Sequence, residues 1–256
     1  MDKMNNKLIY NTDIVVKEYR DHDYLIKPEQ IILKYISKTK SNKRMLDIGV
    51  GAGRTTKYFA PLFEEYYGID YAESMIRECR TKYSNFKYYF HEADARSLKR
   101  FNDNFFDFVL FSFNGIDCVS VNDRQKVLKE IFRVLKKDGL FAFSIHNINH
   151  IPTLFSFQLP KNPFKWKKEF KRRKEVHNLN PSAEKYYMND FIEIIDGDID
   201  FKATYIYSKP EAQVAQLKNI GFKVDNILSM KGLKIRPDNS DWQYIKDAWL
   251  YFLCIK

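Results

Sequence analysis

Cysteine is scarce in this sequence, and its spacing excludes several classes of protein. The 256 residues contain three cysteines, Cys79, Cys118 and Cys254, which form no Cys-x-x-Cys pair and no disulfide framework. This favours a reducing compartment, so we expect a cytoplasmic protein. Histidine, cysteine and acidic residues also do not cluster at the spacing of metal ligands, so we expect no metal site.

Long apolar runs are missing as well. None approaches the length needed to span a bilayer, and the first seven residues are polar, unlike a signal peptide. Hydrophobic residues make up 45% of the chain and aromatic residues 16%, which excludes wholesale disorder and allows a sizeable core. The length suits one large domain, or one domain with an elaborated insertion.

Positive charge is concentrated in one segment. The formal net charge is +10, and the segment from Lys161 to Lys174 holds eight basic residues against one acid, Glu169, which accounts for +7. The aromatic residues that lie among these charges are Phe164, Trp166 and Phe170. Three roles fit this pattern: a solvated lid edge, an interfacial helix on anionic lipid, or a strip that binds the phosphates of nucleic acid or of a phosphorylated substrate.

Residues 28 to 146 alternate between helical and extended patterns. We expect helices over residues 28–38, 54–63, 70–82 and 124–136, and strands over residues 44–48, 66–70, 86–91, 106–113 and 140–145. Capping-box spacings mark three helix starts: Asp70 with Glu73, Asn122 with Gln125, and Ser208 with Glu211. Strands that alternate with helices predict right-handed βαβ units, and hence a doubly wound, mainly parallel sheet.

The pattern changes after His146. Residues 186–195 and 199–207 are typical of two strands, and Asp196-Gly197 between them is a hairpin signal. A helix is expected from residue 210 to about residue 219, followed by strands over residues 222–230 and 248–255 that rejoin the sheet. Because ligands bind beyond the carboxyl ends of the strands in such sheets, an insertion after the fifth strand would lie over the site as a lid.

The clearest motif is the glycine turn of residues 47–53, Asp-Ile-Gly-Val-Gly-Ala-Gly, between a predicted strand and a predicted helix. Glycine tolerates positive φ and lets a ligand approach the backbone, and the helix N-terminus adds free N–H groups. The phosphate-loop form needs Gly-Lys-Ser/Thr, and the dinucleotide form needs a third glycine where Arg54 stands, so neither form fits. Asp47 suits a ligand with an ammonium group and would repel a pyrophosphate.

Two further carboxylates follow strand ends. Asp70 ends the second strand, 17 residues after Gly53, where an acid accepts hydrogen bonds from ribose hydroxyls in nucleoside-binding sheets. Asp94 follows the third strand, where it is placed to accept a bond from an exocyclic amine such as adenine N6. Each carboxylate alone also fits a helix N-cap or a solvated strand end, but the three together favour a ligand.

Together these motifs resemble one family. Residues 47–53, 68–70 and 93–95, with the helix and turn of residues 127–140, are similar in order and spacing to the class I S-adenosylmethionine-dependent methyltransferases. That family usually has Leu-Lys-Pro-Gly-Gly before the fifth strand, and here Lys137 and Asp138 replace the proline and the first glycine. The resemblance implies S-adenosylmethionine as cofactor and a seven-stranded Rossmann-like α/β sheet, with the β-hairpin and basic lid inserted after the fifth strand.

The resemblance also assigns roles along the chain. Residues 1–27 would be an N-terminal lid or arm, 28–147 the S-adenosylmethionine-binding core, 148–207 a substrate-lid insertion, and 208–256 the helix and strands that complete the core. Asp47 and the glycine turn would hold the methionine part, Asp70 the ribose and Asp94 the adenine. The residues expected to bind the cofactor are Asp47, Gly49, Gly51, Gly53, Asp70, Tyr71, Met75, Asp94, Ala95, Phe111, Ser112 and Asn114.

Methyl transfer needs little from a protein beyond alignment and the exclusion of water, because the sulfonium is already a good leaving group. A general base is needed only when the acceptor is a neutral hydroxyl or a protonated amine. The candidate bases are His146 and His150 after the fifth strand and Asp117 after the fourth. Each also fits a structural role, His146 as a hydrogen-bonded strand end and the other two as solvated loop residues.

We therefore expect a methyltransferase that acts on a small molecule, such as a sugar or a glycan- or lipid-linked intermediate. The hairpin near Tyr186-Tyr187 and residues 143–147 resemble small-molecule methyltransferases. Two alternatives stay open: a nucleic-acid or protein methyltransferase docked through residues 161–174, and a cofactor-binding regulatory protein without turnover. Residues 112–117 lack the Asn/Asp-Pro-Pro-Tyr motif of nucleobase amine methylation, which argues against nucleic acid. The sequence does not specify the oligomeric state.

Overall fold

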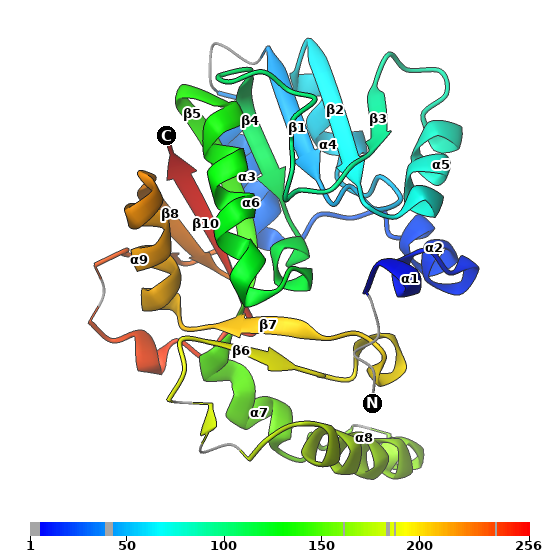
Figure 1. Cartoon of the computed structure of the whole chain (residues 1–256). Coiled ribbons are helices and arrows are strands. Elements are labelled where there is room, and N and C mark those ends of the chain that lie inside the picture. Colours follow the sequence, from blue (N-terminus) through cyan, green and yellow to red (C-terminus); the bar gives the residue numbers. More distant parts are fainter. Residues whose placement is uncertain (1–5, 39–42, 161, 183–184, 187, 239) are drawn as a thin grey trace.

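The computed structural model describes residues 6–38, 43–160, 162–182, 185–186, 188–238 and 240–256. Within them, one sheet is covered by helices on both faces (Figure 1). Residues 1–5 of the expected N-terminal arm, Lys161 of the basic segment and Tyr187 of the expected hairpin lie outside the described residues. No helix in the described ranges is long and apolar enough to cross a membrane.

Five parallel strands form the centre of the sheet. They are β1 (Arg44–Ile48), β2 (Glu65–Asp70), β3 (Tyr89–Glu92), β4 (Phe106–Phe111) and β5 (Leu135–Asn147). Strand β1 lies between β2 and β4, with Asp47 opposite both Gly68 and Leu110. The doubly wound, mainly parallel α/β core expected from the sequence is confirmed.

The remaining strands extend the sheet beyond β5. Strand β10 (Trp249–Ile255) pairs antiparallel with both β5 and β8 (Lys223–Ser229), and β9 (Lys234–Ile235) is added at the edge. The order is β3-β2-β1-β4-β5-β10-β8-β9. A hairpin of β6 (Phe191–Ile194) and β7 (Tyr205–Ser208) joins through the pairing of β7 with β5, so the described sheet has ten strands where we expected seven.

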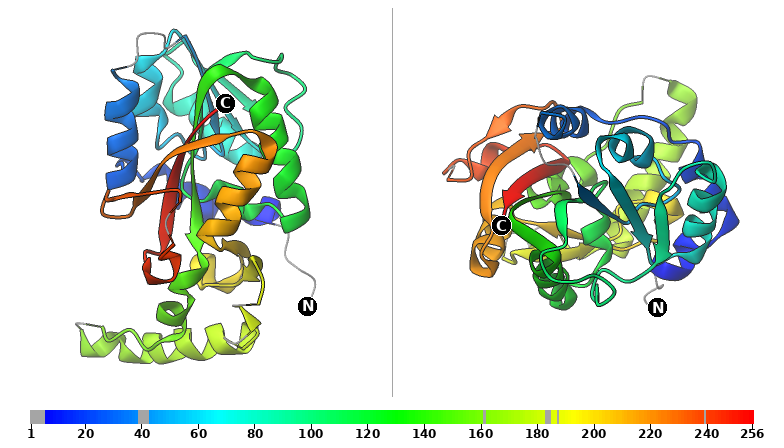
Figure 2. Two further views of the ribbon diagram at one scale, coloured as in Figure 1. Left: turned by 90° about the vertical axis from the view of Figure 1, so that its left-hand side faces the viewer. Right: turned by 90° about the horizontal axis from the view of Figure 1, so that it is seen from above.

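Each face of the sheet has its own layer of helices (Figure 2, right). Helices α6 (Val121–Val134) and α9 (Pro210–Ile220) cover one face, and α3 (Lys27–Ile36), α4 (Thr56–Phe59) and α5 (Glu73–Lys82) cover the other. Alternate residues of β4 serve the two faces: Val109 packs in the α6 layer, and Phe108 and Leu110 pack in the α3 layer. The apolar run of β4 is therefore that of a strand buried on both faces.

Helix starts differ from the predicted capping boxes. Ser120, and not Asn122, caps α6 by accepting a hydrogen bond from the Asp123 N–H. The Asp70 carboxylate does not cap α5, because it accepts from the backbone of Gly51 and Ala72. Ser208 belongs to β7, where it is buried, so α9 begins after Lys209 without a side-chain cap. All three spacings match the motif, but strand ends and turns compete for the same side chains.

The helix expected over residues 54–63 is shorter than predicted. It consists of α4 followed by a 3-10 turn over Ala60–Leu62. Pro61 explains the change, because a proline has no N–H to continue the α-helical hydrogen bonds. Helix α9 stops where expected, at Gly221, whose φ of +116° suits glycine.

The predicted hairpin forms with shorter strands and a wider connection. Ile194 pairs with Tyr205, so residues 195–204 connect the strands and Asp196-Gly197 does not make a two-residue turn. Within the connection, the Tyr207 hydroxyl donates to Asp196 and the Tyr205 hydroxyl donates to Asp198. These side-chain bonds hold the acidic residues of the loop against β7, which is why the strands separate early.

The insertion after β5 lies beyond the carboxyl ends of the parallel strands (Figure 1). It contains α7 (Ile151–Phe155), α8 (Trp166–Leu179) and the β6–β7 hairpin. These elements share a separate apolar cluster with the N-terminal helices α1 (Asn6–Tyr10) and α2 (Asp13–Arg20). Two parts of the chain that are distant in sequence therefore meet over the same edge of the sheet.

Removing a central aromatic side chain tests this packing. Phe143 is fully buried, and its ring lies 4.6 Å from that of Phe141 and 5.2 Å from that of Phe252, measured between centroids. We expect Phe143→Ala to lower the free energy of unfolding by about 3 to 5 kcal/mol in urea titrations, because it leaves a cavity. Phe164→Ala, at a side chain that is 93% exposed, is the control and should change stability little. Equal effects of the two variants would contradict the assigned core.

Candidate functional site

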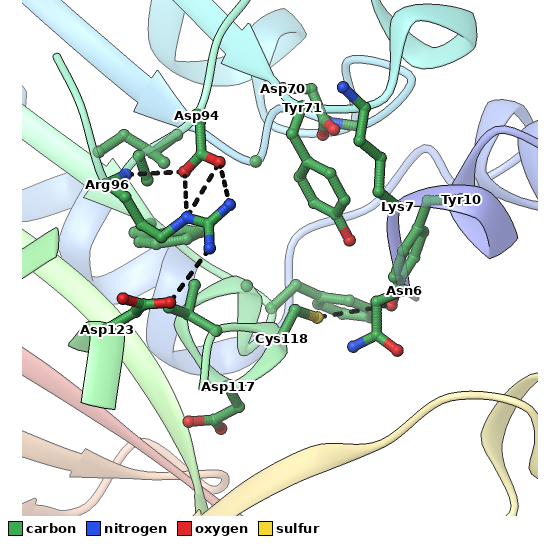
Figure 3. A pocket seen from close by; sticks show the side chains of 18 of the residues that line it. Asn6, Lys7, Tyr10, Asp70, Tyr71, Asp94, Arg96, Asp117, Cys118 and Asp123 are labelled. Carbon is green, nitrogen blue, oxygen red and sulfur yellow. Dashed lines mark hydrogen bonds and ion pairs between the residues drawn. The ribbon is translucent and has the colours of Figure 1, made fainter. Parts of the chain in front are cut away.

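A cavity of about 400 Å³ lies where the carboxyl ends of β1, β2 and β4 meet (Figure 3). Its wall includes nine of the twelve residues predicted to bind cofactor, namely Gly49, Gly51, Asp70, Tyr71, Met75, Asp94, Ala95, Phe111 and Ser112. The other three, Asp47, Gly53 and Asn114, are not part of this wall. The structure thus brings together most of the residues that the sequence motifs singled out.

The glycine turn has the backbone conformation that its composition predicts. Gly49, Gly51 and Gly53 have φ values of +64°, +55° and +83°. A Cβ atom added at Gly53 would lie 2.6 Å from the Tyr83 ring, so this glycine is needed for packing against α5 and not for contact with a ligand. Gly49 and Gly51 line the cavity and expose their backbone to it.

Asp70 ties the end of β2 to the glycine turn. One carboxylate oxygen accepts from the Gly51 N–H at 3.0 Å, and the other accepts from the Ala72 N–H at 2.9 Å. Burial raises the pKa of Asp70 to about 6, although these backbone bonds act in the opposite direction. Each carboxylate oxygen keeps a second lone pair, so the ionised group can still accept from two ribose hydroxyls.

Asp47 lies under the glycine turn. Its carboxylate accepts from the Thr55 hydroxyl at 2.5 Å and from the Tyr66 hydroxyl at 2.7 Å. Burial raises its pKa to about 6, against the effect of these two hydrogen bonds. The structure therefore gives Asp47 a role in shaping the turn, whereas a direct contact with a methionine ammonium group stays a prediction.

Asp94 is partly exposed and is held by Arg96 (Figure 3). The Arg96 guanidinium donates to both of its oxygens, at 2.6 and 3.0 Å, and also reaches Asp123 at 3.1 Å. Burial alone would raise the pKa of Asp94, but the hydrogen bonds from Arg96 outweigh it and hold the pKa below its usual value. An ionised acceptor thus stands at the predicted adenine position.

The exit of β4 has a strained backbone. Phe113 and Asn114 have φ values of +55° and +59°, a region that costs non-glycine residues about 1 to 3 kcal/mol each. Two hydrogen bonds oppose this cost: Phe113 N–H donates to the Tyr251 hydroxyl, and Asn114 N–H donates to the Ser144 hydroxyl. The strain lies beside Ser112, one of the residues expected to bind the cofactor.

A buried ion pair that the sequence analysis missed supports this exit. The Arg54 guanidinium donates to both oxygens of Glu29, at 2.7 and 2.6 Å, and to the Ser112 hydroxyl at 3.3 Å. Burial lowers the pKa of Arg54, but the bonds to Glu29 outweigh it and raise the pKa above its usual value. Arg54 also lies over the Phe113 ring, 4.4 Å from its centroid. The one hint in the sequence was an arginine directly after the last glycine of the turn.

Two of the three predicted bases are bonded to each other. His146 Nδ1 lies 2.9 Å from an oxygen of Asp117, and the other oxygen of Asp117 accepts from Arg124 at 2.6 Å. Asn114 Nδ2 lies 3.1 Å from His146 Nε2. Asp117 lines the cavity and His146 does not.

The third predicted base, His150, is placed elsewhere. Its Nδ1 atom lies 3.0 Å from the Lys246 carbonyl oxygen, and the residue is not part of the cavity wall. Among the described residues, no group of three histidine, cysteine or acidic side chains is arranged to hold a metal ion.

Tyrosines close the cavity on the side away from the sheet, and no motif in the sequence pointed to them. Tyr10 and Tyr19 come from α1 and α2 and line the cavity. The Tyr10 hydroxyl lies 3.0 Å from that of Tyr205, and burial raises the pKa of both groups, so they remain neutral donors. The Tyr71 hydroxyl points into the cavity and has no hydrogen-bond partner in the described part of the chain (Figure 3).

Known methyltransferases resemble this chain both in sequence and in fold. Residues 46–143 match the family model of a methyltransferase domain. The chain is 35% identical to the ubiquinone/menaquinone biosynthesis C-methyltransferase UbiE of Yersinia pestis, over 40% of this chain and 42% of that protein. It is 26% identical to the malonyl-[acyl-carrier protein] O-methyltransferase of Bacillus cereus, over 71% and 65%. Residues 46–143 therefore form a methyltransferase domain, in line with the resemblance of its motifs to the class I S-adenosylmethionine-dependent methyltransferases.

A solved methyltransferase structure shares the whole fold. The S-adenosylmethionine-dependent methyltransferase from Clostridium acetobutylicum superposes with a TM-score of 0.64 and 17% identity, and the match covers 98% of each chain. In sequence, the chain spans about half the length of the curated relatives it matches.

The residues present fit S-adenosylmethionine, the cofactor of this family. The glycine turn exposes backbone at Gly49 and Gly51, and Asp70 supplies a buried acceptor. The unpartnered Tyr71 hydroxyl offers one more polar group inside the cavity. A cofactor with ribose and amino acid groups could form hydrogen bonds with these groups.

The pKa of Asp70 predicts how cofactor binding depends on pH. Above about pH 6 the carboxylate is ionised and accepts hydroxyl bonds, and below that value it binds a proton and loses acceptor capacity. We expect the Kd for S-adenosylmethionine, measured by calorimetry, to rise about tenfold for each pH unit below 6. Asp70→Asn should bind weakly at every pH, whereas Asp47→Asn should keep the dependence. A wild-type affinity that is flat down to about pH 5 would refute the assignment.

The ion pair predicts a second, separate result. Arg54→Met leaves the Glu29 carboxylate buried without its partner, so we expect a loss of about 3 to 5 kcal/mol in the free energy of unfolding. The double variant Glu29→Met/Arg54→Met removes both charges and should recover much of that loss. Urea titrations of the two variants side by side provide the measurement. If the double variant is no more stable than the single one, the pair does not have the role described.

Proposed function

We propose that this protein transfers the methyl group of S-adenosylmethionine to a small-molecule acceptor. The observation that carries the proposal is the cavity, whose sheet side holds the cofactor motifs and whose other side is built by the insertion and the N-terminal helices. The names of two relatives support it, since they describe methylation in quinone biosynthesis and of a malonyl group on a carrier protein.

A second cavity offers room for the acceptor. It has a volume of about 850 Å³, within the range of small-molecule sites, and it shares Glu193 and Thr204 with the first cavity. Its wall is mainly aromatic and aliphatic, with contributions from Tyr186, Phe191 and Phe201. An acceptor bound there would reach the cofactor cavity past the β6–β7 hairpin, so the hairpin would select the acceptor.

The chemistry follows from the groups that face the cavity. The cofactor supplies a methyl group on a sulfonium, which leaves without help from an acid. The chain would orient the two molecules and exclude water, with the neutral Tyr10 and Tyr19 covering the site.

The contacts of Asp117 and His146 support a positioning role for these two residues. One oxygen of Asp117 accepts from Arg124, and the other is bonded to His146. His150 is bonded to the Lys246 carbonyl and is not part of the cavity wall, so we assign it no role in the reaction. This favours an acceptor that is nucleophilic without a protein base.

Methyl transfer can be followed directly. Purified protein is incubated with methyl-labelled S-adenosylmethionine and with separated low-mass, protein and nucleic-acid fractions of a cell extract, and the labelled product is identified by mass spectrometry. We expect label in the low-mass fraction. Asp70→Ala should abolish it, whereas Lys34→Ala, on the exposed face of α3, should leave it unchanged.

Two outcomes would overturn the proposal. Label that appears only on the amino acid side chains of proteins or on nucleic acid would assign the macromolecular alternative. Cofactor binding without transfer to any fraction would instead indicate a regulatory protein without turnover.

A further inference from the structure

We propose that the outer end of the insertion binds an anionic lipid surface. The surface in question consists of Phe157, Leu159, Phe164, Lys165, Trp166, Lys167, Lys168, Phe170 and Lys171, and we call it the aromatic-basic tip. These residues come from the described part of the connection after α7 and from the first half of α8. The proposal concerns a surface outside both cavities, so it does not depend on the acceptor.

Large apolar side chains are exposed at this tip. Phe164 is 93% exposed, Leu159 72% and Phe170 58%. Figure 2 (left) shows α8 as the outermost layer of the molecule, beyond the hairpin. A group of exposed apolar side chains on a projecting element marks an interaction site more often than an ordinary solvated surface.

The charges of the tip all have one sign. Lys165, Lys167, Lys168 and Lys171 are all exposed. Glu169 is the one acid between residues 161 and 174, and it is buried, with Arg172 donating to both of its oxygens at 2.7 Å. The acid is thus neutralised inside the fold, and the exposed charges of the tip are all lysines.

The tip is preformed by contacts within the insertion. Arg172 also donates to the carbonyl oxygens of Leu154 and Ser156, which fastens α8 to α7. The Phe157 and Phe170 rings lie 4.8 Å apart between centroids, and Trp166 Nε1 donates to the Pro160 carbonyl at 3.4 Å. Binding would therefore require little ordering of the backbone, which reduces its entropic cost.

The combination of groups favours lipid over nucleic acid. Lysines interspersed with exposed aromatic and aliphatic side chains suit the boundary between headgroups and acyl chains, where both kinds of group are satisfied. A phosphate strip for nucleic acid would satisfy the lysines, but Leu159 cannot stack on a base as an aromatic ring does. Arginine suits phosphates because its guanidinium is planar and forked, but the guanidinium of Arg172 is directed inward, to the Leu154 carbonyl.

Vesicle binding of the full chain tests the proposal. The protein is mixed with vesicles of phosphatidylcholine alone, or of phosphatidylcholine with phosphatidylglycerol, and the bound fraction is measured by sedimentation. We expect binding only with phosphatidylglycerol, and a shift of tryptophan emission to shorter wavelength as Trp166, which is 43% exposed, enters the interface. Raising the salt concentration should weaken the binding.

Matched variants separate the tip from overall charge. Lys167→Glu/Lys168→Glu should weaken vesicle binding at least about tenfold, since each lysine near an anionic surface contributes to affinity. Phe164→Ala should also weaken it, through lost apolar burial. The control Lys129→Glu/Lys223→Glu makes the same charge change at exposed positions outside the tip and should bind normally. Circular dichroism confirms that each variant is folded.

Three results would overturn the proposal. The first is no binding to the phosphatidylglycerol vesicles. The second is binding that the tip variants and the control variant weaken equally, which would indicate general attraction of a basic protein. The third is salt-dependent binding of RNA or DNA through the same lysines without vesicle binding, which would assign the tip to nucleic acid.

Discussion

The buried pair of Glu29 and Arg54 joins the parts of the chain from which the site is built. Burying two charges is costly, and here the cost is offset because the polar atoms are hydrogen-bonded: Glu29 accepts from Arg54, from Tyr251 and from the Ile26 N–H. Arg54 directly follows the glycine turn, and Tyr251 holds the strained backbone of Phe113. One interaction thus connects α3, the turn, the exit of β4 and the last strand of the sheet.

Around this connection, the carboxylates of the site differ by environment. Asp47 and Asp70 are buried, and burial raises their pKa values to about 6, whereas Arg96 lowers the pKa of the more exposed Asp94. The three aspartates therefore have different roles. Asp47 shapes the glycine turn, Asp70 accepts a hydrogen bond from the turn and lines the cavity, and Asp94 is kept ionised by Arg96. The neutral tyrosines of α1 and α2 complete the enclosure of the cavity. Such an enclosure excludes water, which would favour methyl transfer.

Local patterns predicted some elements well and others poorly. Strand β1 has the predicted bounds, and β2, α3 and β10 begin and end within two residues of them, because a continuous apolar run or a clear helical stripe leaves few alternatives. The capping residues of α5, α6 and α9 were wrong, since several polar residues near each start could have capped it. The hairpin was right in kind and wrong in detail, because Tyr205 and Tyr207 bind acids in its loop that no local rule connects to them.

The sequence by itself determined the order of strands and helices, the glycine turn and the acids beside it, because each depends on periodicity, on backbone freedom or on spacing within a few residues. Tertiary structure decided which polar groups meet: Asp117 with His146, Glu29 with Arg54, and Tyr10 with Tyr205. These partners are 25 to 195 residues apart, and only the packing of the layers brings them within hydrogen-bonding distance. The tertiary structure also showed that Glu169 is buried, so that the exposed charges of the aromatic-basic tip are all lysines.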